Sequence, residues 1–295
     1  MNFPRFWAKG TARQLNSRGK PVTFSTWRWS DNSLSEAQSL ADQAARRIAE
    51  RFVKDGKLPS RGYGYLNRPF REPVLRESRN GFGEPSFVIT RNSYGATVLN
   101  TARIMFLDVD ADDQGGRASP RAVGFLSRLF GAKPEPKPAG PSPVEQRNLD
   151  SLKRWLNQHP DWNCRLYRTR AGFRILATHE LYDPESATSN GIFAALGVDP
   201  LYQQLCKLQK CFRARLTPKP WRCRASLPPS QWPWADAKAE AKFRDWQNRY
   251  TELCRPWATC ALIGTFGSGN VHSEIQPVIA QHDEATRANS NLPLA

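Results

Sequence analysis

The sequence lacks the cysteine and histidine spacings of common zinc sites. Its six cysteines form no Cys-x-x-Cys pair, and its four histidines stand at no spacing typical of a zinc finger. In a chain of this length, such cysteines are typical of reduced, mostly buried thiols in a cytosolic protein. We therefore expect a cytoplasmic protein without a zinc site.

Long hydrophobic runs are also missing. The first residues, MNFPRFWAKGTARQ, contain no apolar segment of the kind found in a signal peptide. No apolar run in the chain approaches the length that spans a membrane. We expect no cleaved signal and no membrane partner.

Acidic residues are few beside the basic ones. The chain has 27 Asp and Glu against 43 Lys and Arg, which gives a formal net charge of +16. A field of this sign favours polyanions, and arginine suits the geometry of phosphate. The expected partners are DNA or RNA and a nucleoside triphosphate; the alternative is a basic protein that is merely soluble. With 39% hydrophobic residues and ten tryptophans, the 295 residues are enough to bury a sizeable core.

Hydrophobic periodicity predicts an α+β fold, in which a mixed or antiparallel central sheet is flanked by helices and carries a proline-rich insertion. Strands are expected at 86–90, 96–100, 102–110, 163–169, 173–178, 212–217 and 257–266, the last one buried. Helices are expected from Ser33 to the stop signals Gly56 and Pro59, and at 144–158, 184–196, 200–211, 235–253 and 271–288.

Composition divides the chain into an arm and one domain. Residues 1–30 form a basic aromatic N-terminal arm, and residues 31–290 form a single α+β domain with an insertion or linker at 114–143. The aromatic and basic side chains of the arm can stack bases and hold phosphates. An irregular arm pinned to the core has the same composition, and we favour that interpretation.

The stretch ARIMFLDVD, residues 102–110, is the most informative. Its apolar run predicts a buried strand that ends in two carboxylates. Strand side chains alternate, so Asp108 and Asp110 point to the same side, with Cα atoms about 7 Å apart. Two such carboxylates are well placed to hold Mg²⁺ or Mn²⁺. The alternative is a solvated strand end.

A second informative stretch, YRTRAGFRILATH, predicts a hairpin. Arg174 stands inside its apolar second strand, and a buried arginine needs an anionic partner. Asp108 or Asp110 on a neighbouring strand, or a bound phosphate, would supply it; an edge arginine that reaches water is the alternative. Arg168 and Arg170 flank the turn and can face the same anion.

A third stretch, LCKLQKCFRARLTPKPWRCR, has seven basic residues and no acidic one. Arg213 and Arg215 share a strand face, and Lys219 and Arg222 lie in a rigid Pro-Lys-Pro-Trp turn. Fixed cations beside Trp221 are typical of a platform for a nucleic-acid backbone or a triphosphate. A solvated basic face is the other interpretation.

Weaker signals come from two histidines and one loop. His179 ends the strand of Arg174 beside acidic residues, and His282 precedes Asp283 on the last helix. Adjacent helix positions diverge by about 100°, so one metal ion cannot easily take both. The loop Gly264–Gly269 joins a strand to a helix and can hold a phosphate, but the signal is weak because it lacks the lysine of a P-loop and the rest of a dinucleotide fingerprint.

Phe106–Asp110 and Gly172–Leu176 together resemble motifs of the archaeo-eukaryotic primase (primase-polymerase) superfamily. FLDVD matches its first motif, two hydrophobic residues and Asp-x-Asp, and GFRIL is similar to its second, with Arg174 where the family has a phosphate-contacting histidine. The third motif adds an acidic residue, for which Asp236, Glu240 and Glu274 are the positions considered.

The resemblance implies a two-metal nucleotidyltransferase that acts on nucleic acid. Asp108 and Asp110 would be its catalytic residues and would bind Mg²⁺ or Mn²⁺. The phosphate-binding residues would be Arg168, Arg170, Arg174, Arg213, Arg215, Lys219 and Arg222.

Other classes of function compete with this one. The first alternative is a non-catalytic nucleic-acid-binding protein on a primase-like scaffold. A phosphatase with an Asp-x-Asp loop usually has Thr or Val where Asp112 stands here. A glycosyltransferase with an Asp-x-Asp site is a further alternative, but it would not explain the net charge of +16.

Overall fold

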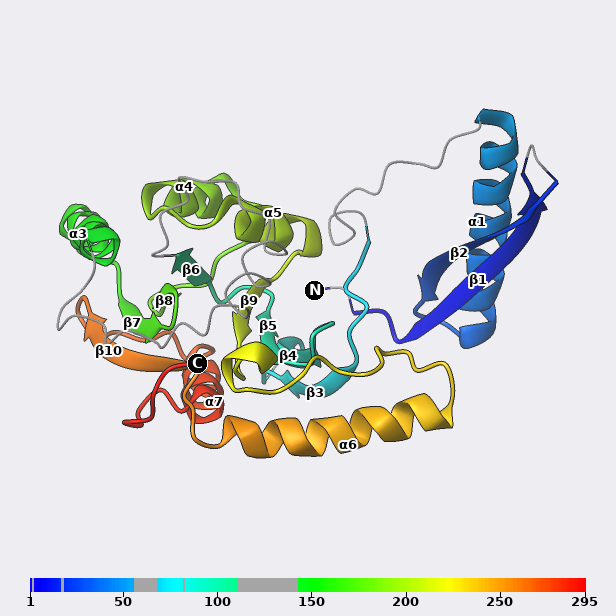
Figure 1. Ribbon diagram of the computed structural model, residues 1–295. Coiled ribbons are helices and arrows are strands. Elements are labelled where there is room, and N and C mark those ends of the chain that lie inside the picture. The colour runs from blue at the N-terminus through cyan, green and yellow to red at the C-terminus, as the bar shows by residue number, and fades with distance from the viewer. Residues whose placement is uncertain (2, 17–18, 56–67, 82, 111–142) are drawn as a thin grey trace.

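The computed structural model describes residues 1, 3–16, 19–55, 68–81, 83–110 and 143–295. Helices and antiparallel strands are mixed along them, which confirms the predicted α+β fold (Figure 1). The insertion expected at 114–143 lies outside the described residues except for Pro143. Among the helices described, none is both long and apolar enough to cross a bilayer.

The strands are β1 (Phe6–Leu15), β2 (Pro21–Ser30), β3 (Val74–Arg79), β4 (Pro85–Arg91), β5 (Thr97–Thr101), β6 (Phe106–Asp110), β7 (Cys164–Thr169), β8 (Gly172–Ala177), β9 (Phe212–Arg215) and β10 (Cys260–Phe266). The helices are α1 (Leu34–Asp55), α3 (Pro143–Gln158), α4 (Ala187–Ala195), α5 (Pro200–Gln209), α6 (Ala237–Cys254) and α7 (Gln276–Thr286), with a 3₁₀ turn η1 (Pro220–Arg222).

The strands form three antiparallel sheets, with the orders β1-β2, β10-β7-β8-β6 and β3-β4-β5-β9. The single central sheet that we expected is divided in two, and the aspartate strand β6 does not join the sheet of β4 and β5. Thr101 Oγ1 donates to the Ile104 carbonyl at 2.6 Å, which closes a tight turn after β5. The chain then enters the other sheet, where β6 pairs with β8.

The N-terminal residues form a hairpin rather than an irregular arm. Strands β1 and β2 pair along their whole length and pack on α1, so this unit continues beyond the boundary expected at residue 30. Gly10 permits the close approach, because a Cβ there would lie 2.1 Å from the Ala41 carbonyl carbon. Figure 1 shows the unit at one side of the molecule, apart from the two larger sheets.

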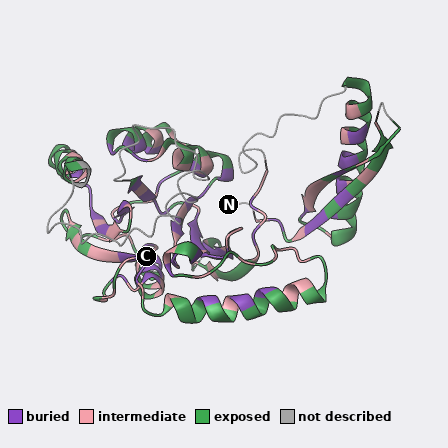
Figure 2. Ribbon diagram, in the orientation of Figure 1, coloured by how far each residue is buried: buried purple, intermediate pink, exposed green. Residues whose placement is uncertain are grey.

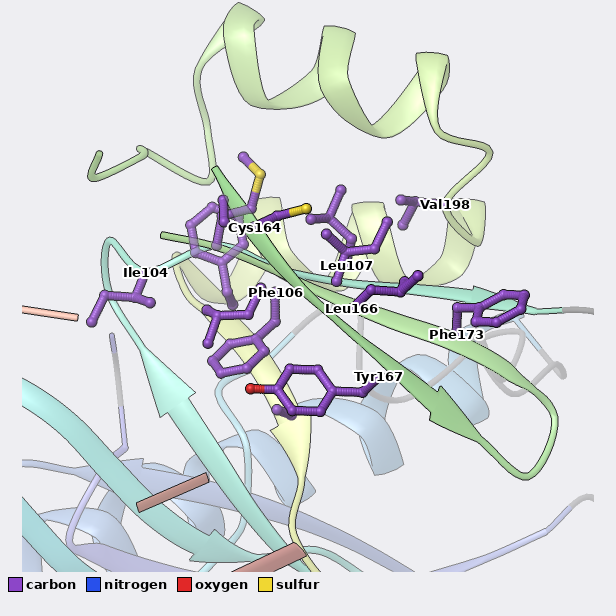
Figure 3. Close-up of a cluster of buried hydrophobic side chains, with 14 of the residues drawn as sticks. Ile104, Phe106, Leu107, Cys164, Leu166, Tyr167, Phe173 and Val198 are labelled. Carbon is purple, nitrogen blue, oxygen red and sulfur yellow. The ribbon is translucent and has the colours of Figure 1, made fainter. Parts of the chain in front are cut away.

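The sheet of β6, β7 and β8 separates two environments. On one face, Leu107, Leu166 and Ile175 meet α3 and the end of α4 in an apolar core. Figure 3 shows side chains of β6, β7 and β8 gathered with Val198, from the turn between α4 and α5. On the other face, Tyr167 and Arg174 carry polar groups that meet α7.

One side chain of α5 joins the two larger sheets. The Tyr202 hydroxyl lies 2.7 Å from the Phe106 carbonyl of β6 and 3.1 Å from the Arg213 carbonyl of β9. A hydroxyl has one proton, so these carbonyls share it. The ends of β6 and β9 are thereby held beside each other.

Two elements, β10 and α6, are only partly buried. Strand β10 was expected to be buried, but it is an edge strand with a bulge near Ile263, whose exposed fraction is 44%. Helix α6 buries only one side, through Phe243, Trp246 and Tyr250. Figure 2 shows its outer surface, like that of α1, as mostly exposed.

Candidate functional site

Asp108 and Asp110 stand on one face of β6, as their spacing predicted. Asp108 is opposite Arg174 in the register with β8, and Asp110 is opposite Gly172. A glycine presents no side chain on this face, so the strand end near Asp110 is open on that side. Asn148 of α3 donates to the Asp110 carbonyl at 3.2 Å, which fixes the backbone there.

Arg174 forms a two-pronged ion pair with Asp108. Its Nε lies 2.8 Å from Asp108 Oδ1, and its Nη2 lies 3.2 Å from Oδ2. The arginine side chain is 1% exposed and the aspartate side chain 38% exposed. The predicted partnership of a buried arginine with one of the aspartates is therefore confirmed. The pair occupies both carboxylate oxygens of Asp108.

A polar network that we did not predict also contacts Arg174. Its Nη1 donates to the Arg215 carbonyl at 2.9 Å and lies 3.4 Å from His282 Nε2. His282 Nδ1 lies 3.0 Å from Asp283 Oδ1. Asp283 also accepts hydrogen bonds from two β7 side chains, Arg165 and Tyr167. The sequence signal was an adjacent histidine and aspartate on the last helix, which we considered only as metal ligands.

His282 is held as a neutral ring. It is fully buried, and burial lowers its pKa to about 4, while the hydrogen bond to Asp283 acts in the opposite direction. With Nδ1–H donated to Asp283, the unprotonated Nε2 faces the Arg174 guanidinium. A second ring proton would point at that positive charge.

This arrangement predicts acid sensitivity. The folded pKa of His282 is below the unfolded value, so the unfolded state binds more protons between about pH 6.5 and pH 4, and stability falls as the pH falls through this window. At pH 5 the loss relative to pH 7 is about 2 kcal/mol from this histidine. Urea unfolding at both pH values measures it.

The variant His282→Asn separates this effect from other groups that face the ring. Asp283, Asp108, Tyr167, Cys260 and Arg174 are retained in it. Asp283 has a lowered pKa, so its contribution to stability is lost only below about pH 4, outside the interval from pH 7 to pH 5. The variant should be less stable at pH 7 and lose less between pH 7 and pH 5. Equal losses would show that His282 is not the titrating group.

A cluster of cations lies beside the aspartates. We define the cationic cluster as Arg215, at the end of β9, with Lys219 and Arg222, at the two ends of the turn that contains η1. All three are half-buried. Among the residues that the structure describes, no carboxylate forms an ion pair with any of them, and Arg215 Nε is buried without a hydrogen-bond partner.

The members of the cationic cluster repel one another. Burial, followed by the charges of Arg215 and Arg222, lowers the pKa of Lys219 to about 8. Burial and the charges of Arg215 and Arg170 lower the pKa of Arg222 to about 10. The carboxylate of Asp110 acts in the opposite direction on both, which places it on the same side of the molecule as the cluster.

The turn that carries Lys219 and Arg222 is rigid. Pro218 and Pro220 are buried on either side of Lys219, and the Tyr250 hydroxyl of α6 donates to the Pro218 carbonyl at 2.5 Å. Trp221 is 52% exposed, and its ring meets that of Tyr94 edge-on at 5.5 Å. An exposed aromatic ring is therefore fixed beside the cations.

The structure does not bring every predicted residue together. Arg168 lies opposite Phe173 in the register and over its ring, on the sheet face away from Asp108. Arg213 pairs with Glu72 at 2.9 Å and packs over Phe70, so its charge is already balanced. Arg170 is exposed at the turn and lies near Arg222, on the side of the cluster.

In the described residues, Asp108 and Asp110 are not joined by a third metal-ligating side chain. The described part of the chain contains no group of three or more His, Cys, Asp or Glu side chains that could hold a metal ion. Both oxygens of Asp108 are engaged by Arg174. The three positions considered for a third carboxylate have other partners. Asp236 caps α6, Glu240 pairs with Arg244, and Glu274 accepts from Asn80.

The other two weaker signals, His179 and the loop Gly264–Gly269, have structural roles. His179 Nε2 lies 2.9 Å from the Tyr182 hydroxyl, and its ring packs edge-on against Trp162. In the loop after β10, Asn163 Oδ1 accepts hydrogen bonds from the Ser268 hydroxyl and the Gly269 amide. The oxygen of Asn163 thus takes a donor that a phosphate would need.

Comparisons with known proteins found no relative of this chain. Neither the protein-family models, the curated proteins nor the solved structures gave a match to the chain. The function is therefore argued from the site alone.

Proposed function

We propose that this protein binds nucleic acid, and that the cationic cluster holds its phosphates. The observation that carries the proposal is a set of three half-buried cations with no carboxylate partner in the described residues. Unpaired charges that repel one another inside a fold are stabilised when an anion binds among them. A phosphate supplies that anion.

Single-stranded nucleic acid fits this site better than an isolated phosphate does. The exposed ring of Trp221 stands between Lys219 and Arg222 in sequence, and Lys219 Nζ lies 5.6 Å from its centre. Aromatic rings stack on bases while adjacent cations hold the backbone. The net charge of +16 adds long-range attraction for the same ligand.

Salt dependence of binding tests the proposal. Labelled single-stranded DNA and RNA are titrated with the protein at several salt concentrations. Each phosphate contact should contribute about 0.7 to the slope of log affinity against log salt for a single strand. Affinity that is absent, or that does not fall with salt, would remove the proposal.

The lowered pKa of Lys219 predicts an alkaline loss of binding. Lys219 loses its charge as the pH rises through about 8, whereas phosphate contact favours the charged form. Between pH 7 and pH 9 the affinity should fall up to about tenfold. The variant Lys219→Arg keeps its charge over this range, so its affinity should change much less. If the affinity of the variant fell as much as that of the wild type, the pH effect would belong to another group.

A nucleotidyltransferase is the second candidate function. It is favoured by Asp108 and Asp110, which share a sheet face beside the cationic cluster. In such a reaction the 3′-hydroxyl of a nucleic acid loses its proton and attacks the α-phosphate of a nucleoside triphosphate, and the bond to the β-phosphate breaks so that pyrophosphate leaves. The cluster would hold the triphosphate, and Asp110 is the carboxylate not engaged by Arg174.

Nucleotide incorporation separates the two functions. It is measured on single-stranded and primed templates with Mg²⁺ or Mn²⁺, in the wild type and in Asp110→Ala. Incorporation that is lost in the variant would select the nucleotidyltransferase. No incorporation by a wild type that binds in a salt-dependent manner would select the binding protein.

A further inference from the structure

A trough on the N-terminal unit carries a second group of cations. It runs between α1 and β2 with a volume of about 450 Å³, and its lining includes Arg28, Trp29, Leu40, Arg47, Ile48 and Arg51. The lining residues of α1 recur every three or four positions, so they lie on one face of the helix. The trough therefore follows the helix axis for about three turns.

The charges at its rim are not neutralised. Among the residues that the structure describes, no carboxylate forms an ion pair with Arg28, Arg47 or Arg51. Arg47 and Arg51 are exposed and one helical turn apart, a like-charge spacing that destabilises a helix. The Arg28 guanidinium is fixed by its bonds to Thr26 Oγ1 and the Trp27 carbonyl, at 2.9 and 2.8 Å.

Apolar and aromatic groups form the floor. Trp29 is half-buried, with its ring 5.2 Å from that of Trp7, and Leu40 is 41% exposed on the helix. The combination of an aromatic floor and a cationic rim matches the bases and the phosphates of a single strand.

We infer that this trough is a second contact for single-stranded nucleic acid, with bases on the floor and phosphates on Arg28, Arg47 and Arg51. The inference takes its ligand class from the proposed function and adds a separate surface to it. A strand that reaches both the trough and the cationic cluster binds more tightly than one that reaches the cluster alone, since the second contact forms at high effective concentration.

The test uses the full chain and single-stranded oligo(dT) of roughly 10 and roughly 40 nucleotides. Charge reversal in Arg47→Glu/Arg51→Glu should weaken binding of the longer strand at least tenfold and change binding of the shorter strand by less than about twofold. The matched control is Arg46→Glu/Lys54→Glu, with the same charge change on exposed positions of α1 outside the trough.

The outcomes separate the inference from the proposed function. Equal losses in the two pairs would show a general charge effect and overturn the trough. Full affinity of Arg47→Glu/Arg51→Glu for the longer strand would also overturn it, and would favour another occupant such as an acidic peptide. If substitution of Lys219 and Arg222 still weakened binding, the proposed function would stand. Circular dichroism confirms folding, and Arg47→Gln/Arg51→Gln repeats the test without reversed charge.

Discussion

Asp108→Ala is expected to lower the free energy of unfolding by about 3–5 kcal/mol, because it leaves a buried arginine without its anion. Arg174 is 1% exposed, and water that enters in place of the carboxylate compensates its charge only in part. Arg174→Met should cost less, since Asp108 is 38% exposed and can regain water. Urea unfolding followed by circular dichroism measures both.

The double variant Asp108→Ala/Arg174→Met provides the control. Removing both charges leaves neither unpaired, so the double variant should be more stable than Asp108→Ala alone. Asp110→Ala should change stability by less than about 0.5 kcal/mol, because its side chain is exposed. If Asp108→Ala were as stable as the wild type, Arg174 would have another counter-charge. Loss of activity in Asp108 variants alone would therefore not identify a catalytic residue.

The second large effect concerns binding. Lys219→Gln/Arg222→Gln should weaken the binding of single-stranded nucleic acid at least tenfold, because two phosphate contacts are lost. The salt slope should fall by about 0.7 for each contact. Stability should stay constant or rise, since the removed charges repel each other and Arg215.

Lys238→Gln/Lys242→Gln is the matched control. It removes the same charge from exposed positions of α6. A similar loss in this pair would mean that net charge, and not the cationic cluster, governs affinity. A Lys219→Gln/Arg222→Gln protein with wild-type affinity and slope would show that phosphates bind elsewhere.

Local pattern predicted much of the fold and one contact of the site. Apolar runs and turn residues placed β4, β5, β6, β7 and β8 near their observed positions. The pair of Arg174 and Asp108 followed from a simple argument, because a buried cation in a strand needs an anion nearby. Strand alternation also predicted that Asp108 and Asp110 share a face.

Local sequence patterns could not predict the contacts between segments that are distant in the sequence. Nothing in β8 indicates that Arg174 meets His282, which arrives on α7 more than a hundred residues later. Arg213 and Arg215 look alike in sequence, yet only Arg213 has the ion pair, because Glu72 packs against it. The hairpin of β1 and β2 was missed because its basic and aromatic composition was interpreted as an irregular arm, whereas Gly10 admits the backbone of α1.

The repulsion within the cationic cluster links the ligand to the folded state itself. A protein that keeps like charges close together without ligand gains stability whenever an anion occupies them, by about 2.7 kcal/mol at a hundred times the dissociation constant. Melting temperature then becomes a reporter of ligand identity. Ranking oligonucleotides, nucleoside triphosphates and inorganic polyphosphate by the shift they cause would reveal which polyanion the fold is built to hold, before any activity is known.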